Sequence, residues 1–371
     1  MNITYQKQLK GKEVGIVFGT FAPMHQGHLD LIMRAKKECD GGCMVIVDGR
    51  QGDRGGELLP LKRRYRYIRE FFADDDLVAV YPIDETELGI APYPNGWNAF
   101  MGEVFKLFLN GAEGGQAVFY VSEKEYAEQL TSFGCRVVLV DRTKNPISAT
   151  MIRKNPIKYW DKIAYPFRRV YSTNILICGT ASEGKTTLTT DLGKYFNAPY
   201  SHEYARQYME ESYVSEWELD GADYLAFVDG QYQLNKKLIC SSANHGIFFA
   251  DSDSMTTRMY AEYYCKDPTL DLTEEEFQEV AVACDSITAK CKWDKIYLLC
   301  PHGTFVDDHT RYMACSGMAE RNELFEILCN NIKASGNWDK VVILDGGYWK
   351  NFEKIVNDVK ELMENGKVIE E

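Results

Sequence analysis

Apolar and polar residues alternate along the first half of the chain in short blocks. Apolar runs of four or five residues fit buried parallel strands, and the stretches between them carry apolar residues every three or four positions, as amphipathic helices do. The expected strands cover residues 14–18, 44–47, 77–80, 117–121 and 137–140, and the expected helices cover residues 28–38, 61–72, 102–109 and 123–133. This order predicts a doubly wound parallel sheet.

A second alternation of the same kind fills the other half. Its expected strands are 175–178, 246–250, 295–299 and 340–344, and its expected helices are 185–196, 224–238, 273–290, 319–335 and 348–365. Residues 155–173 are aromatic and basic and break the rhythm, so we expect a packed connector there. The prediction is an α/β protein with two parallel-sheet domains, residues 1–170 and residues 171–371.

Residues 179–187 read Gly-Thr-Ala-Ser-Glu-Gly-Lys-Thr-Thr, directly after an expected strand and before an expected helix. This is the G-x-x-x-x-G-K-[ST] loop, whose backbone N–H groups cradle a polyphosphate at a helix N-terminus. We expect Lys185 to reach the β- and γ-phosphates of ATP and Thr186 to bind Mg²⁺. Further ATP contacts are expected from Gly179, Ser182, Gly184 and Thr187. The motif indicates nucleotide binding but does not fix the reaction.

Polar residues elsewhere extend this candidate site. Asp251 and Asp253 end an expected strand, where P-loop proteins hold Mg²⁺, and we place Asp251 with Thr186 at the metal. Glu203 could accept a proton from a substrate hydroxyl, and Arg206 could bind an anion. The alternatives are an ordinary strand-end turn for the aspartates and an exposed ion pair for Glu203 and Arg206.

The polar segment 301–311 follows an expected strand and is poor in helix formers. A lid that carries arginine closes on the transferred phosphoryl group in many kinases. Arg311 and Arg321 are the candidates for that role, and a solvated loop is the alternative.

The first half carries its own phosphate signature, Gly19 to His28, at the end of its first expected strand. His25 and His28 are three residues apart, so they share one face at the start of a helix, where imidazole N–H groups and the helix dipole suit a polyphosphate. Ser148 can cap a second helix, on which Arg153 can direct a guanidinium at phosphate.

Two other stretches of the first half carry candidate chemistry. Tyr93 and Trp97 lie in a long Pro- and Gly-rich loop and could stack on a flat cationic heterocycle such as pyridinium, or Trp97 could simply pack in the core. The helix 61–72 carries four arginines, which are either a local positive island or a solvated face: Arg63, Arg64, Arg66 and Arg69.

Composition narrows the functional classes. The net charge of −13 argues against a nucleic-acid partner. The eleven cysteines are scattered without a C-x-x-C pair, which favours buried thiols in a reducing compartment. The N-terminus lacks an apolar segment and no run of eighteen apolar residues occurs, so we expect no membrane insertion and a cytoplasmic protein.

Four motifs together resemble one known family. The segments 19–28 (G-T-F-A-P-M-H-Q-G-H) and 147–153 (I-S-A-T-M-I-R) are similar to the paired motifs of nucleotidylyltransferases. The segments 92–97 (P-Y-P-N-G-W) and 155–160 (N-P-I-K-Y-W), followed by a P-loop domain, resemble the NadR family. These are bifunctional nicotinamide-mononucleotide (NMN) adenylyltransferases and ribosylnicotinamide kinases, and the resemblance extends from about residue 12 to residue 365.

The resemblance implies the chemistry and the partners. Residues 171–371 would phosphorylate nicotinamide riboside with ATP, and residues 1–170 would transfer AMP from a second ATP to NMN, giving NAD and pyrophosphate. His25, His28 and Arg153 would stabilise the triphosphate, and Trp97 would stack on nicotinamide. Further ATP contacts are implied for Gly19, Thr20, Phe21, Ser148 and Thr150, and substrate contacts for Tyr93, Glu203, Tyr204 and Arg206.

Three positions depart from the family pattern: Thr20 stands where Lys is frequent, Ala22 where many nucleotidylyltransferases have Asp, and His202 where Trp is usual. The departures at Ala22 and His202 keep open an alternative, a pyridine-nucleotide sensor with one weak or inactive site. A third possibility is adenylyl transfer to another small phosphate, such as phosphopantetheine. About a dozen residues precede the first expected strand, so we expect no helix-turn-helix repressor domain, and the sequence leaves a homo-oligomer open.

Overall fold

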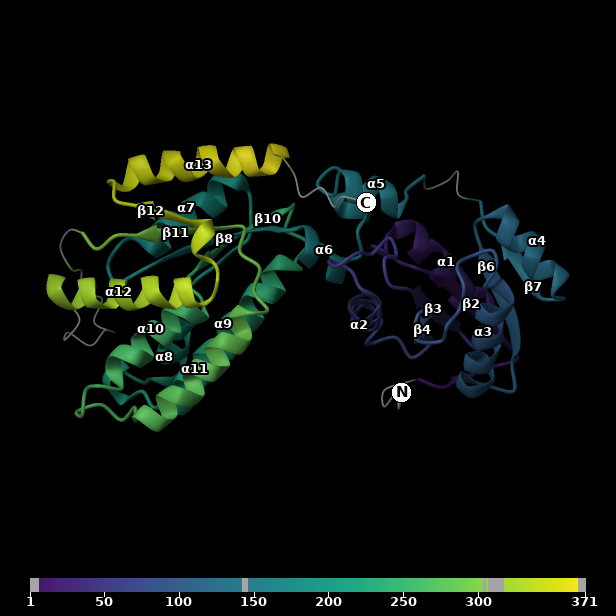
Figure 1. Cartoon of the computed structure of the whole chain (residues 1–371), viewed down its shortest axis with the longest axis horizontal. Coiled ribbons are helices and arrows are strands. Elements are labelled where there is room, and N and C mark those ends of the chain that lie inside the picture. Colours follow the sequence, from purple (N-terminus) through teal and green to yellow (C-terminus); the bar gives the residue numbers. More distant parts are fainter. Residues whose placement is uncertain (1–6, 142–145, 303–304, 306–316, 366–371) are drawn as a thin grey trace. The chain divides into compact units, whose positions relative to one another are not determined.

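The computed structural model describes residues 7–141, 146–302, 305 and 317–365. Within these residues the chain divides into two compact units, of which the first ends at Tyr171 and the second begins at Ser172. We call them unit 1 and unit 2. Figure 1 shows helices packed against a sheet in each of them.

The core of unit 1 is a five-stranded parallel sheet in the order β4-β3-β2-β6-β7. These strands are β2 (Glu13–Gly19), β3 (Cys43–Gly49), β4 (Val78–Asp84), β6 (Gln116–Val121) and β7 (Arg136–Leu139). A separate parallel pair joins β1 (Leu9–Lys10) to β5 (Ala112–Glu113). Consecutive residues in the middle of β2 and β3 are buried, because helices cover both faces of the sheet.

The helices of unit 1 are α1 (Gln26–Glu38), α2 (Leu61–Phe71), α3 (Trp97–Gly111), α4 (Lys124–Ser132), α5 (Ala149–Lys154) and α6 (Tyr165–Tyr171), with a short 3₁₀ turn at Trp160–Lys162. Alternate residues of β2 enter two different cores: Val17 packs with α1, α2 and α6, and Ile16 packs with α3. The predicted doubly wound arrangement is confirmed. Helix α3 begins five residues before the predicted residue 102, so Trp97 lies in its first turn.

Unit 2 has a five-stranded parallel sheet in the order β12-β11-β8-β10-β9. Its strands are β8 (Thr173–Gly179), β9 (Tyr200–Ser201), β10 (Ile247–Asp251), β11 (Lys295–Leu299) and β12 (Val341–Leu344). Its helices are α7 (Lys185–Phe196), α8 (Tyr204–Ser212), α9 (Gly221–Ile239), α10 (Ser254–Tyr264), α11 (Glu274–Thr288), α12 (Met318–Ala334) and α13 (Tyr348–Asn365), with 3₁₀ turns at Glu216–Glu218 and Trp338–Lys340.

Two cores lie on opposite faces of the unit 2 sheet. Helices α7 and α13 cover one face, and α9 to α12 cover the other, as the left half of Figure 1 shows. Helix α7 has the predicted bounds, since the P-loop motif marks its start. Helices α8 and α10 were not predicted. Helix α8 buries no residue completely, and its apolar residues Ala205, Tyr208 and Met209 are only partly buried against the core.

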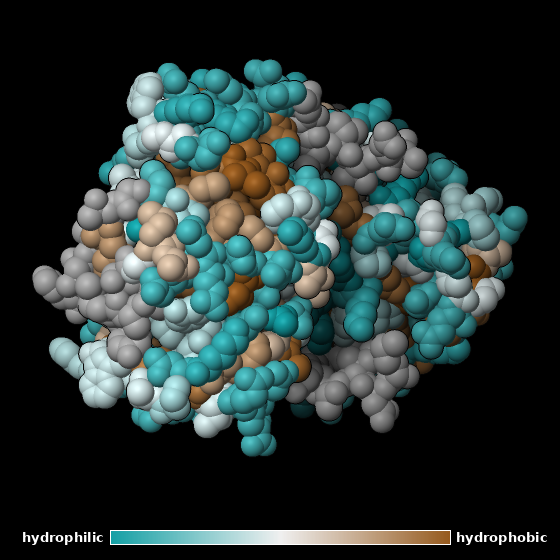
Figure 2. Space-filling view, turned by 60° about the vertical axis from the view of Figure 1, so that its left-hand side comes forward, coloured by the Kyte–Doolittle hydropathy of each residue, from teal (hydrophilic) through white to brown (hydrophobic). Residues whose placement is uncertain are grey.

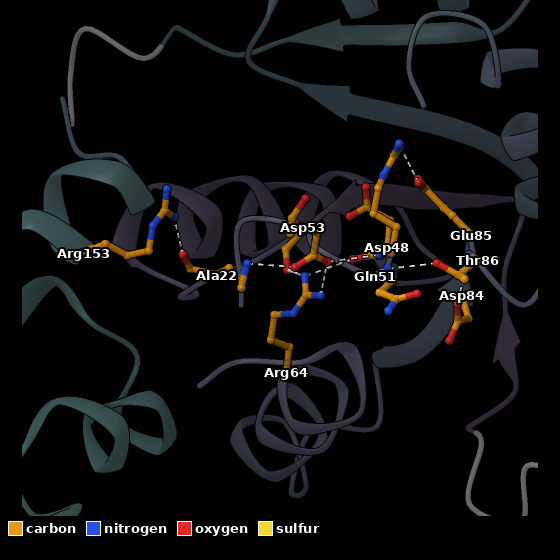
Figure 3. Close-up of polar contacts among 12 residues, drawn as sticks. Ala22, Asp48, Gln51, Asp53, Arg64, Asp84, Glu85, Thr86 and Arg153 are labelled. Carbon is orange, nitrogen blue, oxygen red and sulfur yellow. Dashed lines mark hydrogen bonds and ion pairs between the residues drawn. The ribbon is translucent and has the colours of Figure 1, made fainter. Parts of the chain in front are cut away.

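A buried arginine joins the carboxyl ends of β2 and β3. Arg64 of α2 donates hydrogen bonds to the carbonyl oxygens of Thr20 and Asp48, the latter at 3.1 Å, and pairs with the Asp53 carboxylate (Figure 3). A side chain at Gly49 would lie 2.7 Å from the Arg64 guanidinium, so this position favours glycine. The side chain of Arg64 is fully buried, so it belongs neither to a positive surface island nor to a solvated face.

No helix in the described part of the chain is both long and apolar enough to cross a membrane. The face of the molecule in Figure 2 is mostly polar and carries a limited apolar area.

Replacing Arg64 with Ala should destabilise unit 1 by about 3–5 kcal/mol, because it leaves Asp53 without its partner and two strand-end carbonyls without donors. Hydrogen exchange read by mass spectrometry would show this as faster exchange in β2 and β3 peptides. Arg66→Ala, on the exposed side of the same helix, is the control and should change little. Equal exchange in both variants would contradict the role assigned to Arg64.

Candidate functional site

The predicted histidine site is a hollow at the carboxyl end of β2, between the first turns of α1 and α5. We call it the histidine hollow. Its lining residues include Gly19, Thr20, Phe21, Ala22, His25, His28, Asp48, Arg54, Tyr126, Ser148, Thr150 and Arg153. The structure therefore brings together both predicted motifs of unit 1, although more than a hundred residues separate them in the sequence.

His25 and His28 are fixed by hydrogen bonds to the backbone at the start of α1. The Nδ1 atom of His25 accepts from the Gly27 N–H (3.2 Å), and the Nδ1 atom of His28 accepts from the His25 N–H (3.3 Å). Their rings are stacked with centroids 3.8 Å apart. Since each Nδ1 is an acceptor, each neutral imidazole carries its proton on Nε2 and can donate from that atom. Donors fixed in this way suit the oxygen atoms of a polyphosphate.

Helix α5 supplies the second half of the hollow. Ser148 caps this helix, because its hydroxyl accepts the Met151 N–H at 3.2 Å. The Arg153 guanidinium donates to the carbonyl oxygen of Ala22 (2.7 Å) and to the Thr150 hydroxyl (3.1 Å), and only 3% of the residue is exposed. Figure 3 shows this contact between Arg153 and Ala22. Arg153 thus fixes the loop after β2 and lines the hollow as well.

Arg54, an exposed cation that lines the histidine hollow, was not predicted from the sequence. Asp53 shapes its loop, accepting the backbone N–H groups of Arg50 (3.2 Å) and Gly55 (2.8 Å). The available signal was an aspartate followed by glycines directly after a buried strand, a pattern typical of a turn at a strand end. Arg54 adds a positive charge to a hollow that already holds two imidazoles and a guanidinium.

A second hollow adjoins the first, and we call it the tryptophan hollow. It is lined by Phe18, Asp48, Glu85, Ile90, Ala91, Tyr93, Gly96, Trp97, Phe100 and Tyr126. Phe18, Asp48 and Tyr126 line both hollows. Trp97 is only 8% exposed, and the ring of Tyr126 lies parallel to its ring with centroids 5.6 Å apart. The hydroxyl of Tyr93 donates to Glu125 at 2.5 Å, and this bond raises the pKa of Tyr93 to about 12.

In unit 2 the P-loop lines a third hollow, the lysine hollow. Its lining residues include Ser182, Glu183, Gly184, Lys185, Thr186, Thr187, His202, Glu203 and Arg206. Gly184 has a φ of 79°, a left-handed conformation that favours glycine, and it immediately precedes α7. The Lys185 ammonium donates to the carbonyl oxygen of Thr180 at 2.8 Å, which holds it close to the loop. Gly179, at the end of β8, is not among the lining residues.

Asp251 is the last residue of β10, and Thr186 lies in the first turn of α7. The two side chains are in contact. The Thr186 hydroxyl donates to the Asp251 carboxylate at 2.5 Å. Burial raises the pKa of Asp251; the charge of Glu203 raises it further, and Lys185 opposes both effects. A buried carboxylate beside a hydroxyl has the oxygen ligands that Mg²⁺ prefers, so these two side chains fit the metal. Among the described residues no group of three or more His, Cys, Asp or Glu could hold a metal ion.

A buried ion pair anchors the P-loop to a distant helix. The Glu183 carboxylate pairs with the Arg321 guanidinium of α12, and both side chains are almost completely buried. The same carboxylate accepts the backbone N–H of His302 at 3.0 Å and lies 2.7 Å from its Nδ1 atom. Arg321, a candidate lid residue in the sequence, therefore contacts Glu183 of the P-loop. Arg311 lies outside the described residues.

A fourth hollow, the aromatic hollow, continues from the lysine hollow. It is lined by Glu203, Ala205, Arg206, Met209, Glu216, Leu219, Tyr224, Phe227, Gln231, Ser252, Asp253, Thr256, Thr257 and Tyr260. Glu203 and Arg206, at the start of α8, line both hollows of unit 2. A carboxylate and a guanidinium therefore lie where a ligand on the P-loop and a ligand among the aromatic side chains would meet.

Two further residues predicted for the site of unit 2, Asp253 and Tyr204, make hydrogen bonds within the protein. Asp253 caps α10 by accepting the Met255 N–H (3.0 Å) and also accepts the Trp293 indole N–H (2.9 Å). Burial raises the pKa of Asp253 to about 6. The Tyr204 N–H donates to Gln231 at 2.7 Å, and its side chain lies outside the residues that line the two hollows.

Two family models match the chain, one in each unit. The model described as cytidylyltransferase-like matches residues 16–155, and the model described as an AAA domain matches residues 174–351. Each match contains one of the two phosphate motifs.

Curated relatives extend over nearly the whole chain. The "Trifunctional NAD biosynthesis/regulator protein NadR" of Salmonella typhimurium is 29% identical over 367 residues, which are 95% of this chain and 84% of the relative. The protein of the same name from Escherichia coli is 26% identical, with the same coverage.

Two solved structures match the whole fold. A NadR protein in complex with NR is 34% identical, with a TM-score of 0.78, and the match covers 96% of this chain and 97% of that one. A NadR protein in complex with NAD and AMP-PNP is 34% identical, with a TM-score of 0.76, and 98% of each chain is covered. Because this likeness spans both units and both phosphate motifs, the chain belongs to the NadR family.

Proposed function

We propose that the protein is a bifunctional enzyme of NAD biosynthesis that uses ATP at two separate sites. Unit 2 phosphorylates nicotinamide riboside to NMN, and unit 1 transfers AMP from ATP to NMN, giving NAD and pyrophosphate. The observation that carries the proposal is the pairing of hollows. In each unit a hollow lined by phosphate-binding groups adjoins a hollow lined by aromatic side chains. The two hollows of a unit share charged residues, which are Asp48 in unit 1 and Glu203 and Arg206 in unit 2.

In unit 2 the lysine hollow would hold ATP and the aromatic hollow the nucleoside. The 5′-hydroxyl attacks the γ-phosphorus, and the bond from that phosphorus to the bridging oxygen of ADP breaks. Glu203 lines both hollows, so it is placed to accept the hydroxyl proton, and Arg206 to stabilise the transferred group. Thr186 and Asp251 would hold Mg²⁺, which neutralises charge on the phosphates when bound.

In unit 1 the histidine hollow would hold the triphosphate of ATP and the tryptophan hollow the nicotinamide ring of NMN. A phosphate oxygen of NMN attacks the α-phosphorus, and pyrophosphate leaves with the electrons of the broken P–O bond. His25, His28, Arg54 and Arg153 all line this hollow. Their N–H donors and positive charges would stabilise the negative charge that develops on the leaving pyrophosphate. Aromatic side chains suit the cationic pyridinium ring.

Single substitutions should separate the two reactions. We expect Lys185→Ala to lower NMN formation from nicotinamide riboside by at least about 10²-fold while NAD formation from supplied NMN stays within two-fold. His28→Ala should have the opposite pattern, because it removes a donor from the histidine hollow alone. Each variant is the control for the other, and product formation is followed by chromatography with ATP and Mg²⁺.

If purified wild-type protein turned over at only one of the two sites, the bifunctional assignment would be wrong. A nucleotide sensor with one inactive site would then be the better description.

Glu203→Gln should lower kcat of the kinase reaction by about 10²–10⁴-fold, since glutamine cannot accept the hydroxyl proton. The KM for ATP should change little, because Lys185 and the P-loop backbone are unaltered. Glu211→Gln, at an exposed position of the same helix, is the matched control and should keep full activity. A Glu203→Gln enzyme with normal kcat would show that another group accepts the proton.

A further inference from the structure

Two carboxylates enter the tryptophan hollow from neighbouring strands. Asp48 is near the end of β3, and Glu85 directly follows β4. The register pairs Asp48 with Ile83, and the Glu85 N–H donates to the carbonyl oxygen of Gly49 at 2.8 Å. Since side chains alternate along a strand, Asp48 and Glu85 lie on the same face of the sheet. Figure 3 shows the two side chains at the same end of the group.

These carboxylates are not equivalent. Glu85 pairs with the Arg50 guanidinium at 2.5 Å. The Oδ1 atom of Asp48 is buried and has no hydrogen-bond partner among the described residues. Burial raises the pKa of Asp48 to about 6, and the negative charge of Glu85 adds to this effect. A buried acceptor without a donor costs free energy, so this oxygen is suited to a donor that arrives with a ligand.

The indole of Trp97 provides a second and independent indication of a ligand. Trp97 is only 8% exposed, it lines the same hollow, and its Nε1–H has no hydrogen-bond partner in the described part of the chain. Buried indole N–H groups usually have a partner. The hollow therefore has both a buried acceptor and a buried donor that the protein itself does not satisfy.

A primary carboxamide complements this pair. Its NH₂ group can donate to Asp48, and its carbonyl oxygen can accept from Trp97. A carboxylate in the same place has no hydrogen to donate and would bring a third negative charge beside Asp48 and Glu85. The chemistry of the hollow thus favours the amide of a pyridine ring over the corresponding acid.

We infer that Asp48, supported by Glu85, is a specificity-determining residue that selects pyridine mononucleotides with a carboxamide and rejects those with a carboxylate. The inference rests on the proposed adenylyl transfer in unit 1. It goes further because it names the residues that choose between the amide and the acid. Selection of this kind works by leaving buried polar groups of the site unpaired when the wrong substrate binds.

The test compares NMN with nicotinate mononucleotide as substrates of the full-length protein. We expect wild-type kcat/KM to favour NMN by about 10²-fold or more. Asp48→Asn should reduce this ratio at least ten-fold, mainly by improving use of the acid, because the asparagine amide can donate to a carboxylate. Glu85→Gln should change the ratio in the same direction. Glu87→Gln, which removes an exposed negative charge from the same loop, should leave the ratio within two-fold.

A wild-type enzyme that uses both mononucleotides equally would overturn the inference but leave adenylyl transfer intact. An equal loss of both activities in Asp48→Asn and Glu85→Gln would also overturn it, because a merely structural role has that effect. If wild-type protein used neither mononucleotide, the proposed reaction itself would fall and the inference with it.

Discussion

Both sites depend on cations that bind backbone carbonyl groups at the carboxyl ends of parallel strands. Arg64 binds the carbonyl oxygens of Thr20 and Asp48, Arg153 binds that of Ala22, and Lys185 binds that of Thr180. A chain with a net charge of −13 repels phosphates at long range, so it must concentrate positive charge locally. A carbonyl oxygen fixes the position of a cation but carries no net charge of its own, whereas the Asp53 carboxylate also neutralises the buried Arg64.

Much of this architecture could be predicted from the sequence. The P-loop fixes the start of α7, and the strand-helix alternation gives the central strands of both sheets, because buried parallel strands are continuous apolar runs. The paired histidines and the segment around Arg153 were also found, since each motif is local. Local patterns suffice where a backbone turn and its ligand contacts lie within a few residues.

The missed features depend on contacts between distant segments. Asp48, Arg54 and Tyr126 reach the hollows of unit 1 only because β3 and α4 pack beside β2 and β6. Arg64 belongs to a strongly basic helix, and its guanidinium lies so close to Gly49 that a side chain there would clash with it, which no periodicity reveals. Helix α8 was missed because its apolar residues are only partly buried. Glu203 is the N-cap residue of this helix, and Arg206 lies in its first turn.

The ion pair between Glu183 and Arg321 has a consequence for synthesis of the protein. Its partners are 138 residues apart, and the central strand β8 lies between β10 and β11, which also follow much later. The nucleotide loop of unit 2 therefore cannot reach its final form on the ribosome until α12 has left the exit tunnel. Unit 1 has all its strands and helices by Tyr171, so it can fold while its neighbour is still being translated. A nascent chain thus passes through a stage at which one nucleotide site is complete and the other has yet to form.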